Sequence, residues 1–248
     1  MSMLLRIPRE LIRKSLNLFG YDLVLDQRSL GYRLAPDEAD KYLWLSSLNI
    51  NTVLDIGANT GEFAQKIRGI LPDAAIFSFE PLGDVFRELQ RNFQGLSNFK
   101  AFNFALGDAN CQMTIFRNKF SPSSSLLSMT EAHKQDFPFT AAQRTETVEV
   151  KRLDDIFPDL KVKENILIKM DVQGYEDKVI KGGEKAISRS RLLIVETSFK
   201  LLYAGQPLFG EIYNSLVQRG FKYIGSWGQL ASPSDGSVLQ ADAMFLKN

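Results

Sequence analysis

Four acidic residues of this 248-residue chain each stand at the end of a short apolar run. They are Asp55, Glu80, Asp171 and Glu196. In a parallel sheet, the carboxyl ends of the strands border the crevice that binds ligands. Carboxylates there can accept hydroxyl groups, pair with a cation or take up a proton. The pattern therefore predicts a site for a ligand that carries hydroxyl groups, positive charge or both.

The segment from Val53 to Gly61 (VLDIGANTG) carries the strongest signal for a cofactor. It leaves an apolar run, turns at Gly57 and enters a helix pattern at Gly61; a glycine turn lets backbone N–H groups approach a ligand because it has no Cβ. A dinucleotide site needs three glycines that seat a pyrophosphate at the helix N-terminus. Here the middle glycine is absent, and Asp55 would repel a diphosphate. S-adenosylmethionine has no phosphate, and its ammonium and sulfonium groups are cations, so the segment favours this cofactor.

Two further segments are placed to hold the rest of such a cofactor. Glu80, in Phe79–Pro81 (FEP), ends the second apolar run and can accept both ribose hydroxyls; an exposed surface acid is the alternative. In Asn103–Asp108 (NFALGD), Leu106 could cover one face of an adenine, and Asp108 or a backbone group could meet its exocyclic amine. A plain turn explains this second segment almost as well.

The reacting centre is predicted at Asp171 and Glu196. Asp171 follows the apolar run Ile166–Met170 and precedes a glycine turn, and Glu196 ends the next apolar run. Two carboxylates side by side at the mouth of the crevice are typical of a general base, a divalent-cation site or ammonium recognition. For methyl transfer to an alcohol, we expect Asp171 to be the base and Glu196 to assist it. A divalent cation stays an open alternative.

Strand and helix patterns alternate along the chain, which predicts a parallel sheet with helices on both faces. The expected strands are 52–56, 75–79, 99–106, 166–170, 192–195, 221–224 and 243–246, and the expected helices are 61–71, 83–93, 175–187 and 209–218. The glycine- and serine-rich segment 225–236 joins the last two strands without a helix, so we expect an antiparallel pair. The fold class is therefore α/β, with a Rossmann-like, doubly wound, seven-stranded and mostly parallel sheet that ends in an antiparallel hairpin.

The chain is predicted to be a single domain, residues 1–248, in which a helical extension (1–48) precedes the catalytic core (49–248). Apolar and basic residues at helical spacing over 1–20 are typical of an amphipathic helix that packs on the domain, forms a dimer contact or docks on an anionic membrane surface. Because charges interrupt its apolar residues, it is neither a secretion signal nor a transmembrane segment. We therefore expect a cytoplasmic protein.

Two short elements are expected between this helix and the core, namely a strand at 21–25 and a helix at 36–48 with Pro36 in its first turn. The segment 116–150 has no clear periodicity and is predicted to be irregular, which marks a mobile or functional loop. Residues 121–144 are our candidate lid over the acceptor, with a merely disordered insertion as the alternative. The lid would offer hydrogen bonds from Ser123, Ser124 and Ser125 and apolar walls from Phe120, Phe137 and Phe139.

Composition narrows the possible chemistry. One cysteine and one histidine exclude an intramolecular disulfide and a thiolate metal cluster, and a Ser-His-Asp enzyme would rest on His133 alone. We expect His133 to be a solvated loop residue and Cys111, in the strand-like stretch 111–116, to be buried. The formal net charge of +1 argues against nucleic acid as a partner and favours a small-molecule or carbohydrate acceptor.

Five motifs, in their order and spacing, resemble the FkbM family of methyltransferases. They are DIGANTG (55–61), FEP (79–81), NFALGD (103–108), RLDD (152–155) and IKMDVQGYE (168–176), within a match from about 51 to 196. The resemblance implies a Rossmann-like fold, S-adenosylmethionine as donor, and O-methylation of a hydroxyl on a sugar, glycan or natural product.

By matching position, the resemblance also implies roles for single residues. It implies that Glu80 holds the ribose and that Asp171 lies near the reacting centre. The amino-acid end of the cofactor would be held by Asp55, Gly57, Asn59 and Gly61, and the adenine would be bordered by Ala105, Leu106 and Asp108.

Two other functions share this fold. An NAD-dependent oxidoreductase is disfavoured by the glycine pattern. A catalytically idle nucleoside-binding module would keep the cofactor site without turnover; loss of Asp55 or Glu80 would favour it, and both are present.

Overall fold

The computed structural model describes residues 21–26, 31–36, 40–118, 121–137, 140, 142–232 and 235–247. The chain divides into two compact units, Met1–Leu48 and Asn49–Asn248. The amphipathic helix expected over 1–20 lies outside the described residues. None of the helices within those ranges is long and apolar enough to cross a membrane.

The first unit contains a two-stranded antiparallel sheet. Strand β1 (Tyr21–Asp26) pairs with β2 (Gly31–Pro36), and the 3-10 helix η1 covers Asp40–Leu48. The strand expected at 21–25 is present, but the helix expected from 36 was placed too early. Pro36 pairs with Tyr21 as the last residue of β2, so it ends a strand instead of starting a helix.

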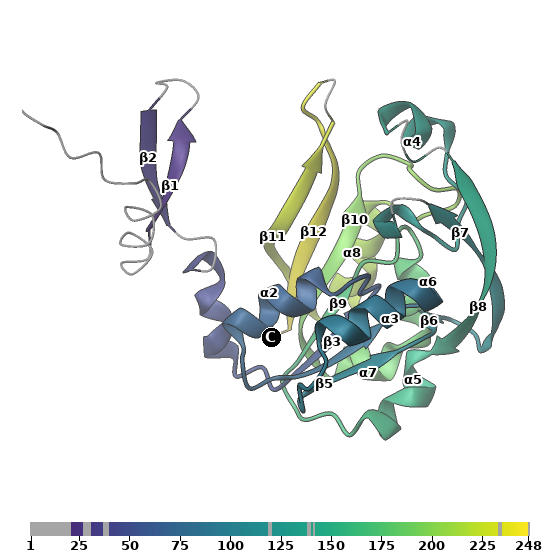
Figure 1. Ribbon diagram of the computed structural model, residues 1–248, viewed down its shortest axis with the longest axis horizontal. Helices are drawn as coiled ribbons and strands as arrows, with labels where there is room; N and C mark the ends of the chain where they lie inside the picture. The colour runs from purple at the N-terminus through teal and green to yellow at the C-terminus, as the bar shows by residue number, and fades with distance from the viewer. Residues whose placement is uncertain are drawn as a thin grey trace, which may run out of the picture. The chain divides into compact units, whose positions relative to one another are not determined.

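The second unit is built on a seven-stranded sheet in the order β11-β12-β10-β9-β3-β4-β5 (Figure 1). The strands are β3 (Thr52–Ile56), β4 (Ala75–Phe79), β5 (Phe99–Phe102), β9 (Ile166–Met170), β10 (Ser190–Ser198), β11 (Phe221–Ala231) and β12 (Val238–Lys247). The five strands from β10 to β5 are mutually parallel, whereas β12 is antiparallel to both of its neighbours. The predicted fold class and its terminal hairpin are confirmed.

Helices connect the parallel strands. They are α2 (Glu62–Ile70), α3 (Gly83–Asn92), α6 (Glu176–Gly182), α7 (Glu184–Ser188) and α8 (Phe209–Gln218). Figure 1 shows α2 and α3 crossing in front of the strands. From β3 the chain continues to β4 on one side, and from β9 it continues to β10 on the opposite side. The strand order therefore reverses between β3 and β9. A crevice opens at such a switch point.

The switch point lies in the densest part of the core. Every residue of β3 and of β9 is buried, as expected for parallel strands covered on both faces. At the carboxyl ends of these strands the backbones approach so closely that a Cβ built on Gly57 would stand 1.9 Å from the Asp171 carbonyl oxygen. Only glycine fits at position 57.

The third predicted strand was wrong in its second half. Strand β5 ends at Phe102 because Asn103 turns the chain, its side-chain amide donating to the carbonyls of Glu80 and Pro81 at 2.9 Å each. The chain then enters a second sheet, of order β6-β8-β7. Its strands are β6 (Ala105–Gly107), β7 (Cys111–Asn118) and β8 (Gln143–Arg152).

The prediction of an irregular segment over 116–150 was therefore also wrong. It holds the ends of β7, all but the last residues of β8, the short helix η2 (Ser121–Ser123) and α4 (Glu131–Asp136). Cys111 is exposed at the start of β7, and His133 is only 4% exposed, with its ring centroid 5.0 Å from that of Tyr203. Both expectations for these side chains were wrong.

We predict that Gly57→Ala destabilises the protein far more than Gly95→Ala. Both glycines have left-handed φ angles, +82° and +83°, but a Cβ at Gly95 meets nothing within 4 Å. Alanine at Gly95 should cost about 1–2 kcal/mol of backbone strain. At Gly57 the clash with the Asp171 carbonyl should add at least about 2 kcal/mol.

The free energies of unfolding of both variants, measured by urea denaturation, test this prediction. Equal losses would show that the ends of β3 and β9 separate at little cost.

Candidate active site

Asp55 lies near the end of β3, between two side chains on the neighbouring strands. It pairs in register with Ser78 of β4 and Lys169 of β9, and its Oδ2 accepts a hydrogen bond from Ser78 Oγ at 3.3 Å. Burial raises the pKa of Asp55 to about 6, an effect that Lys169 and Ser78 partly offset. The buried carboxyl can therefore titrate close to neutral pH.

The glycine loop after β3 uses its own amides inside the protein. The N–H groups of Gly57 and Ala58 both donate to the Phe79 carbonyl at 3.0 Å, and the Asn59 N–H donates to Glu80. The expectation that these amides face a ligand was therefore wrong. The loop contributes its shape, its carbonyls and the Asn59 side chain.

Glu80 ties the two loops on either side of it together. Its Oε2 accepts from the Asn59 N–H at 3.0 Å and its Oε1 from the Leu82 N–H at 2.8 Å, and the residue is 6% exposed. Burial raises the pKa of Glu80 to about 7, although the two N–H donors act in the opposite direction. Each oxygen keeps a second lone pair with which it can accept a ligand hydroxyl.

A cavity of about 670 Å³, including space open to solvent, lies over the ends of β3, β4, β6 and β9. Of the predicted site residues, it is lined by Gly57, Asn59, Glu80, Ala105, Leu106 and Asp171. The predicted lid contributes Ser121, Pro122, Ser124 and Leu126 to the lining, whereas sequence reasoning missed Ile115 and Gln173. The volume suits a nucleoside-sized ligand. We call this space the first cavity.

The serine-rich segment roofs the first cavity. Ser121 Oγ exchanges hydrogen bonds with the Asn59 side chain at 3.1 and 3.2 Å, and Ser125 Oγ donates to the Gln173 carbonyl at 2.7 Å. Ser124 Oγ accepts from the Asn118 N–H. These hydrogen bonds hold the segment across the cavity, and Ser121 and Ser124 form part of its lining. Of the phenylalanines expected in the lid, Phe120 and Phe139 lie outside the described residues.

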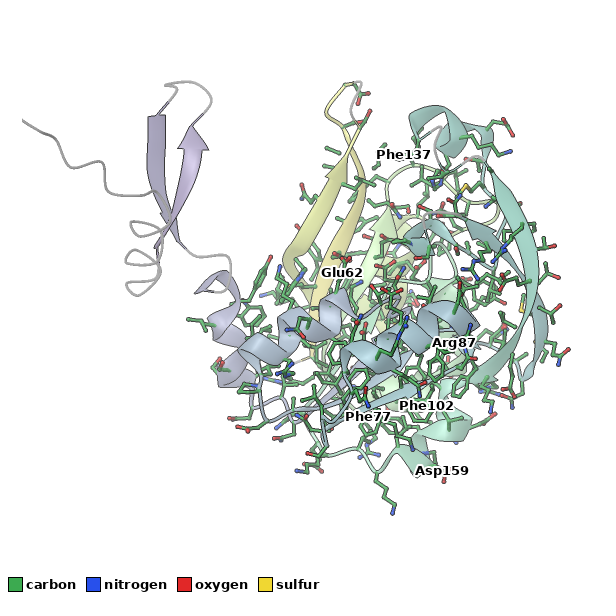
Figure 2. The ribbon with its side chains drawn as sticks, viewed as in Figure 1. Glu62, Phe77, Arg87, Phe102, Phe137 and Asp159 are labelled. Atoms are coloured by element: carbon green, nitrogen blue, oxygen red, sulfur yellow. The ribbon has the colours of Figure 1, made fainter. Side chains whose placement is uncertain are left out.

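A second cavity of about 770 Å³, including open space, adjoins the first between α2 and the β11–β12 hairpin. It shares Gly57, Asn59, Pro122 and Asp171 with the first cavity. Its other walls include Asp55, Glu62, Phe63, Lys66, Lys169, Trp227 and Asp242. Figure 2 labels Glu62 at the end of α2 that faces the base of the hairpin. This cavity thus combines two aromatic rings with charged groups of both signs.

The two predicted reacting acids meet through Gln173. Gln173 Nε2 donates to Asp171 Oδ1 at 2.8 Å and to Glu196 Oε2 at 2.7 Å, and the Tyr203 hydroxyl donates to Gln173 Oε1 at 2.7 Å. Asp171 lines both cavities, whereas Glu196 lines neither. The expected neighbourhood of two acids is present, but only Asp171 faces the open space.

The pKa values of these acids move apart. Burial raises the pKa of Glu196 well above its usual range, and the nearby Asp171 carboxylate raises it further. Burial acts in the same direction on Asp171 and is the largest single effect, but the adjacent Lys169 ammonium, together with hydrogen bonds from Gln173 and Glu196, outweighs it and lowers the pKa of Asp171. At neutral pH the structure therefore favours an ionised Asp171 beside a protonated Glu196.

Two predicted cofactor residues lie away from the cavities. Gly61 is the N-cap residue before α2, and a Cβ there would stand 2.3 Å from the Phe93 ring, so its role is packing. Asp108 pairs with Lys181 at 2.9 Å, and this hydrogen-bonded pair lowers the pKa of Asp108. Neither residue lines the first or the second cavity.

Sequence reasoning missed Lys169. Its position is nevertheless unusual, since it is the one charged residue in the apolar run Ile166–Met170. Its Nζ lies 2.8 Å from Asp171 Oδ2 and 3.6 Å from Asp242 Oδ1. Within the described ranges, no group of three or more His, Cys, Asp or Glu side chains could hold a metal ion.

With this geometry established, comparison with known proteins gives a family. A model described as the methyltransferase FkbM domain matches residues 55–223, which is more than half of the chain. The chain belongs to the FkbM methyltransferase family. The family resemblance carried by the five motifs is confirmed, and the matched range contains all four acids found at the ends of apolar runs.

Two curated relatives of this FkbM-family chain have similar identity. The 2-O-methyltransferase NoeI of Sinorhizobium fredii (strain NBRC 101917 / NGR234) is 30% identical over 165 residues, which are 62% of this chain and 66% of the relative. The methyltransferase sdnD of Sordaria araneosa is 31% identical over 172 residues, which are 58% of this chain and 65% of the relative. The matches thus span just under two thirds of each relative's length.

A crystal structure of methyltransferase FkbM from Methylobacillus flagellatus KT is also similar. It is 16% identical, with a TM-score of 0.49, over 80% of this chain and 44% of that chain.

The raised pKa of Glu80 predicts a pH-dependent stability. The pKa of Glu80 is 4.5 in the unfolded chain and about 7 in the folded protein, so folding takes up a proton at pH values between these two. The stabilisation carried by the protonated carboxyl is complete below the unfolded pKa and is lost as the pH rises through about 7. We expect Glu80 to contribute on the order of 2–3 kcal/mol to this loss.

Urea denaturation at pH 5 and pH 8 measures the effect in the ligand-free protein. The loss of stability between the two pH values should be smaller in Glu80→Gln than in the wild type. Glu88→Gln, at an exposed site on α3, should match the wild type. The same pH dependence in all three proteins would contradict the assignment.

Proposed function

We propose that this chain is an S-adenosylmethionine-dependent methyltransferase that acts on a hydroxyl oxygen of a sugar, glycan or other small molecule. One observation carries the proposal, namely that Glu80 after β4, Leu106 of β6 and Asp171 after β9 line a single cavity. The ribose diol of this cofactor requires a carboxylate, its adenine requires an apolar wall, and its cationic end requires a second acid.

The residues of the first cavity fit the cofactor. Glu80 would accept the ribose hydroxyls, and Ala105 and Leu106 would pack against the adenine. Gly57 lets the Asp171 backbone pack against the loop, and both residues line the wall that the first cavity shares with the second. Asp55 supplies negative charge to the second cavity, near the proposed amino-acid end. When bound, S-adenosylmethionine supplies an electrophilic methyl group on a sulfonium.

The acceptor is proposed to enter through the second cavity. The two cavities share Gly57 and Asp171, so groups bound on either side meet at these residues. Phe63 and Trp227 form an edge-to-face pair with centroids 5.9 Å apart, and Lys66 Nζ lies 4.9 Å from the centre of the Trp227 ring. Aromatic edges beside carboxylates suit an uncharged hydroxylated ring. The name of the relative NoeI, a 2-O-methyltransferase, supports oxygen as the acceptor atom.

Alignment of donor and acceptor is proposed to supply most of the rate. A bound S-adenosylmethionine would supply the methyl group to the acceptor oxygen and keep the electron pair of the broken carbon–sulfur bond, so the residues of this chain have to orient the hydroxyl and take up its proton. Asp171 is the acid that lines both cavities, so we assign it the hydrogen bond that orients the hydroxyl and draws off its proton. In this proposal residues 49–248 form the catalytic domain and residues 1–48 an extension of it.

We predict that S-adenosylhomocysteine binds the purified chain with micromolar affinity and that Glu80→Gln weakens binding at least tenfold. The variant turns an acceptor of the ribose hydroxyls into a partial donor. Calorimetric titration at pH 8, where Glu80 is ionised, measures both affinities. Glu88→Gln is the matched control and should bind as the wild type does.

The same titration with NAD separates the alternative function. Heat released by NAD and none by S-adenosylhomocysteine would overturn the proposal in favour of an oxidoreductase.

We also predict that Asp171→Asn keeps S-adenosylhomocysteine binding within a few fold but lowers methyl transfer at least a hundredfold. The amide cannot take up the proton of the acceptor hydroxyl, a role that is worth about a hundredfold or more. Transfer of radiolabelled methyl groups to a panel of sugars and hydroxylated small molecules measures the turnover.

Asp159→Asn serves as the control, because Asp159 is exposed at the lower edge of the view in Figure 2, on the short helix after α5 (Leu153–Ile156). An Asp171→Asn variant with wild-type turnover would remove Asp171 from the mechanism.

A further inference from the structure

Lys169 is a buried cation in the middle of the acids of the site. The residue is 6% exposed, and its Nζ contacts Asp171 Oδ2 at 2.8 Å and Asp242 Oδ1 at 3.6 Å. Its ammonium also lies 5.7 Å from the centre of the Phe63 ring. An ammonium held by two carboxylates and a ring face is fixed in position. The positive charge of Lys169 therefore acts from a fixed position, closest to Asp171.

Several titratable groups face Asp171 from the surrounding elements. They are Asp55 of β3, Lys169 of β9, Glu176 of α6, Glu196 of β10, Tyr203 and Asp242 of β12. Acids outnumber the single cation of this group. Carboxylates this close together and this deeply buried cannot all be ionised at once.

Asp171 and Glu196 share one hydrogen-bond donor. One amide nitrogen, Gln173 Nε2, donates to an oxygen of each carboxyl, at 2.8 and 2.7 Å. Gln173 is itself held by the hydroxyl of the buried Tyr203. Such a pair binds and releases protons as a unit, and a single proton is shared between its members across the neutral range.

The position of Lys169 breaks the symmetry of this pair. Its ammonium forms ion pairs with Asp171 and Asp242, which both line the second cavity, whereas Glu196 lines neither cavity and accepts from Gln173. We propose that Lys169 is a positioning residue that assigns the shared proton to Glu196, so that Asp171 meets the acceptor hydroxyl as a carboxylate. This inference rests on the proposed function for its consequence in catalysis, but the charge assignment itself can be measured without an acceptor.

The assignment gives each member of the pair a separate task. Each oxygen of Asp171 accepts one strong donor, from Lys169 or Gln173, and keeps a lone pair for the hydroxyl. A protonated Asp171 would instead donate a hydrogen bond and could not take up the proton. The ammonium also supplies, from within the chain, the positive charge that Asp171 and Asp242 require.

Carboxyl titration by carbon-13 NMR of aspartate- and glutamate-labelled protein tests the proposal, with Asp171→Asn and Glu196→Gln used to assign the two signals. In the wild type, Asp171 should stay ionised from pH 5 to 9 while Glu196 stays protonated at pH 7. In Lys169→Met the midpoint of Asp171 should rise by about two pH units or more. Lys169→Arg should restore the wild-type titration, and Lys222→Met, at an exposed site on β11, should leave it unchanged.

A second variant keeps the test decisive if Lys169→Met does not fold. Glutamine resembles a protonated glutamate, so Glu196→Gln should leave the Asp171 titration as it is in the wild type. A wild-type Asp171 that becomes protonated between pH 5 and 8, or an Asp171 signal unaffected by Lys169→Met, would overturn the proposal.

Binding of S-adenosylhomocysteine, measured on the same samples, reports on the proposed function separately. If the wild type fails to bind it while the carboxyls titrate as expected, the methyltransferase assignment fails and the charge assignment stands. Where an acceptor is available, the rate of methyl transfer by Lys169→Met should decrease at pH values below the new titration midpoint of Asp171. Lys169→Arg should restore the wild-type pH profile.

Discussion

The close approach of β3 and β9 at their carboxyl ends is the constraint on which the site depends. The Asp171 carbonyl occupies the space of a side chain at position 57, and the Asp171 N–H donates to the Ile56 carbonyl at 3.0 Å. This contact exists because β3 and β9 are hydrogen-bonded neighbours up to their carboxyl ends, at the point where the strand order reverses. It places Asp171 on the wall that both cavities share. A wider separation would merge the two cavities and remove the point at which donor and acceptor can be aligned.

Burying several acids at this edge requires compensation, which the fold supplies locally. Backbone N–H groups serve Glu80 and Glu176, the latter accepting from Val172 and Gly174 at 3.0 and 3.3 Å. Lys169 forms ion pairs with Asp171 and Asp242. Burial nevertheless raises the pKa of Glu80 and of Glu176 to about 7, so these carboxyls stay partly protonated near neutrality. Because an unpaired buried charge is costly, the arrangement of donors decides which acids are available as anions.

The parts of the fold that the sequence predicts well are those buried on both faces. Strands β3, β4 and β9 were placed to the residue, because each is a short apolar run bounded by turn residues. Strand β8 was missed because only Val148 and Val150 are buried among polar neighbours, a pattern that resembles a loop. The acids of the site could be found because they end strands. Lys169, Gln173 and Asp242 could not, since their proximity depends on register between strands and, for Asp242, on β12 lying next to β10.

The two cavities differ in which part of the chain builds them, and this difference bears on specificity. All described lining residues of the first cavity fall within the range matched by the family, 55–223. Trp227 and Asp242, which line the second cavity, lie beyond it, on the terminal hairpin. In the proposed function, the range matched by the family therefore supplies the donor site, and the terminal hairpin supplies part of the acceptor site. Trp227 lies on the edge strand β11, which can be altered without disturbing the switch point at the centre of the sheet, whereas Asp242 on β12 contacts Lys169 and is tied to that centre.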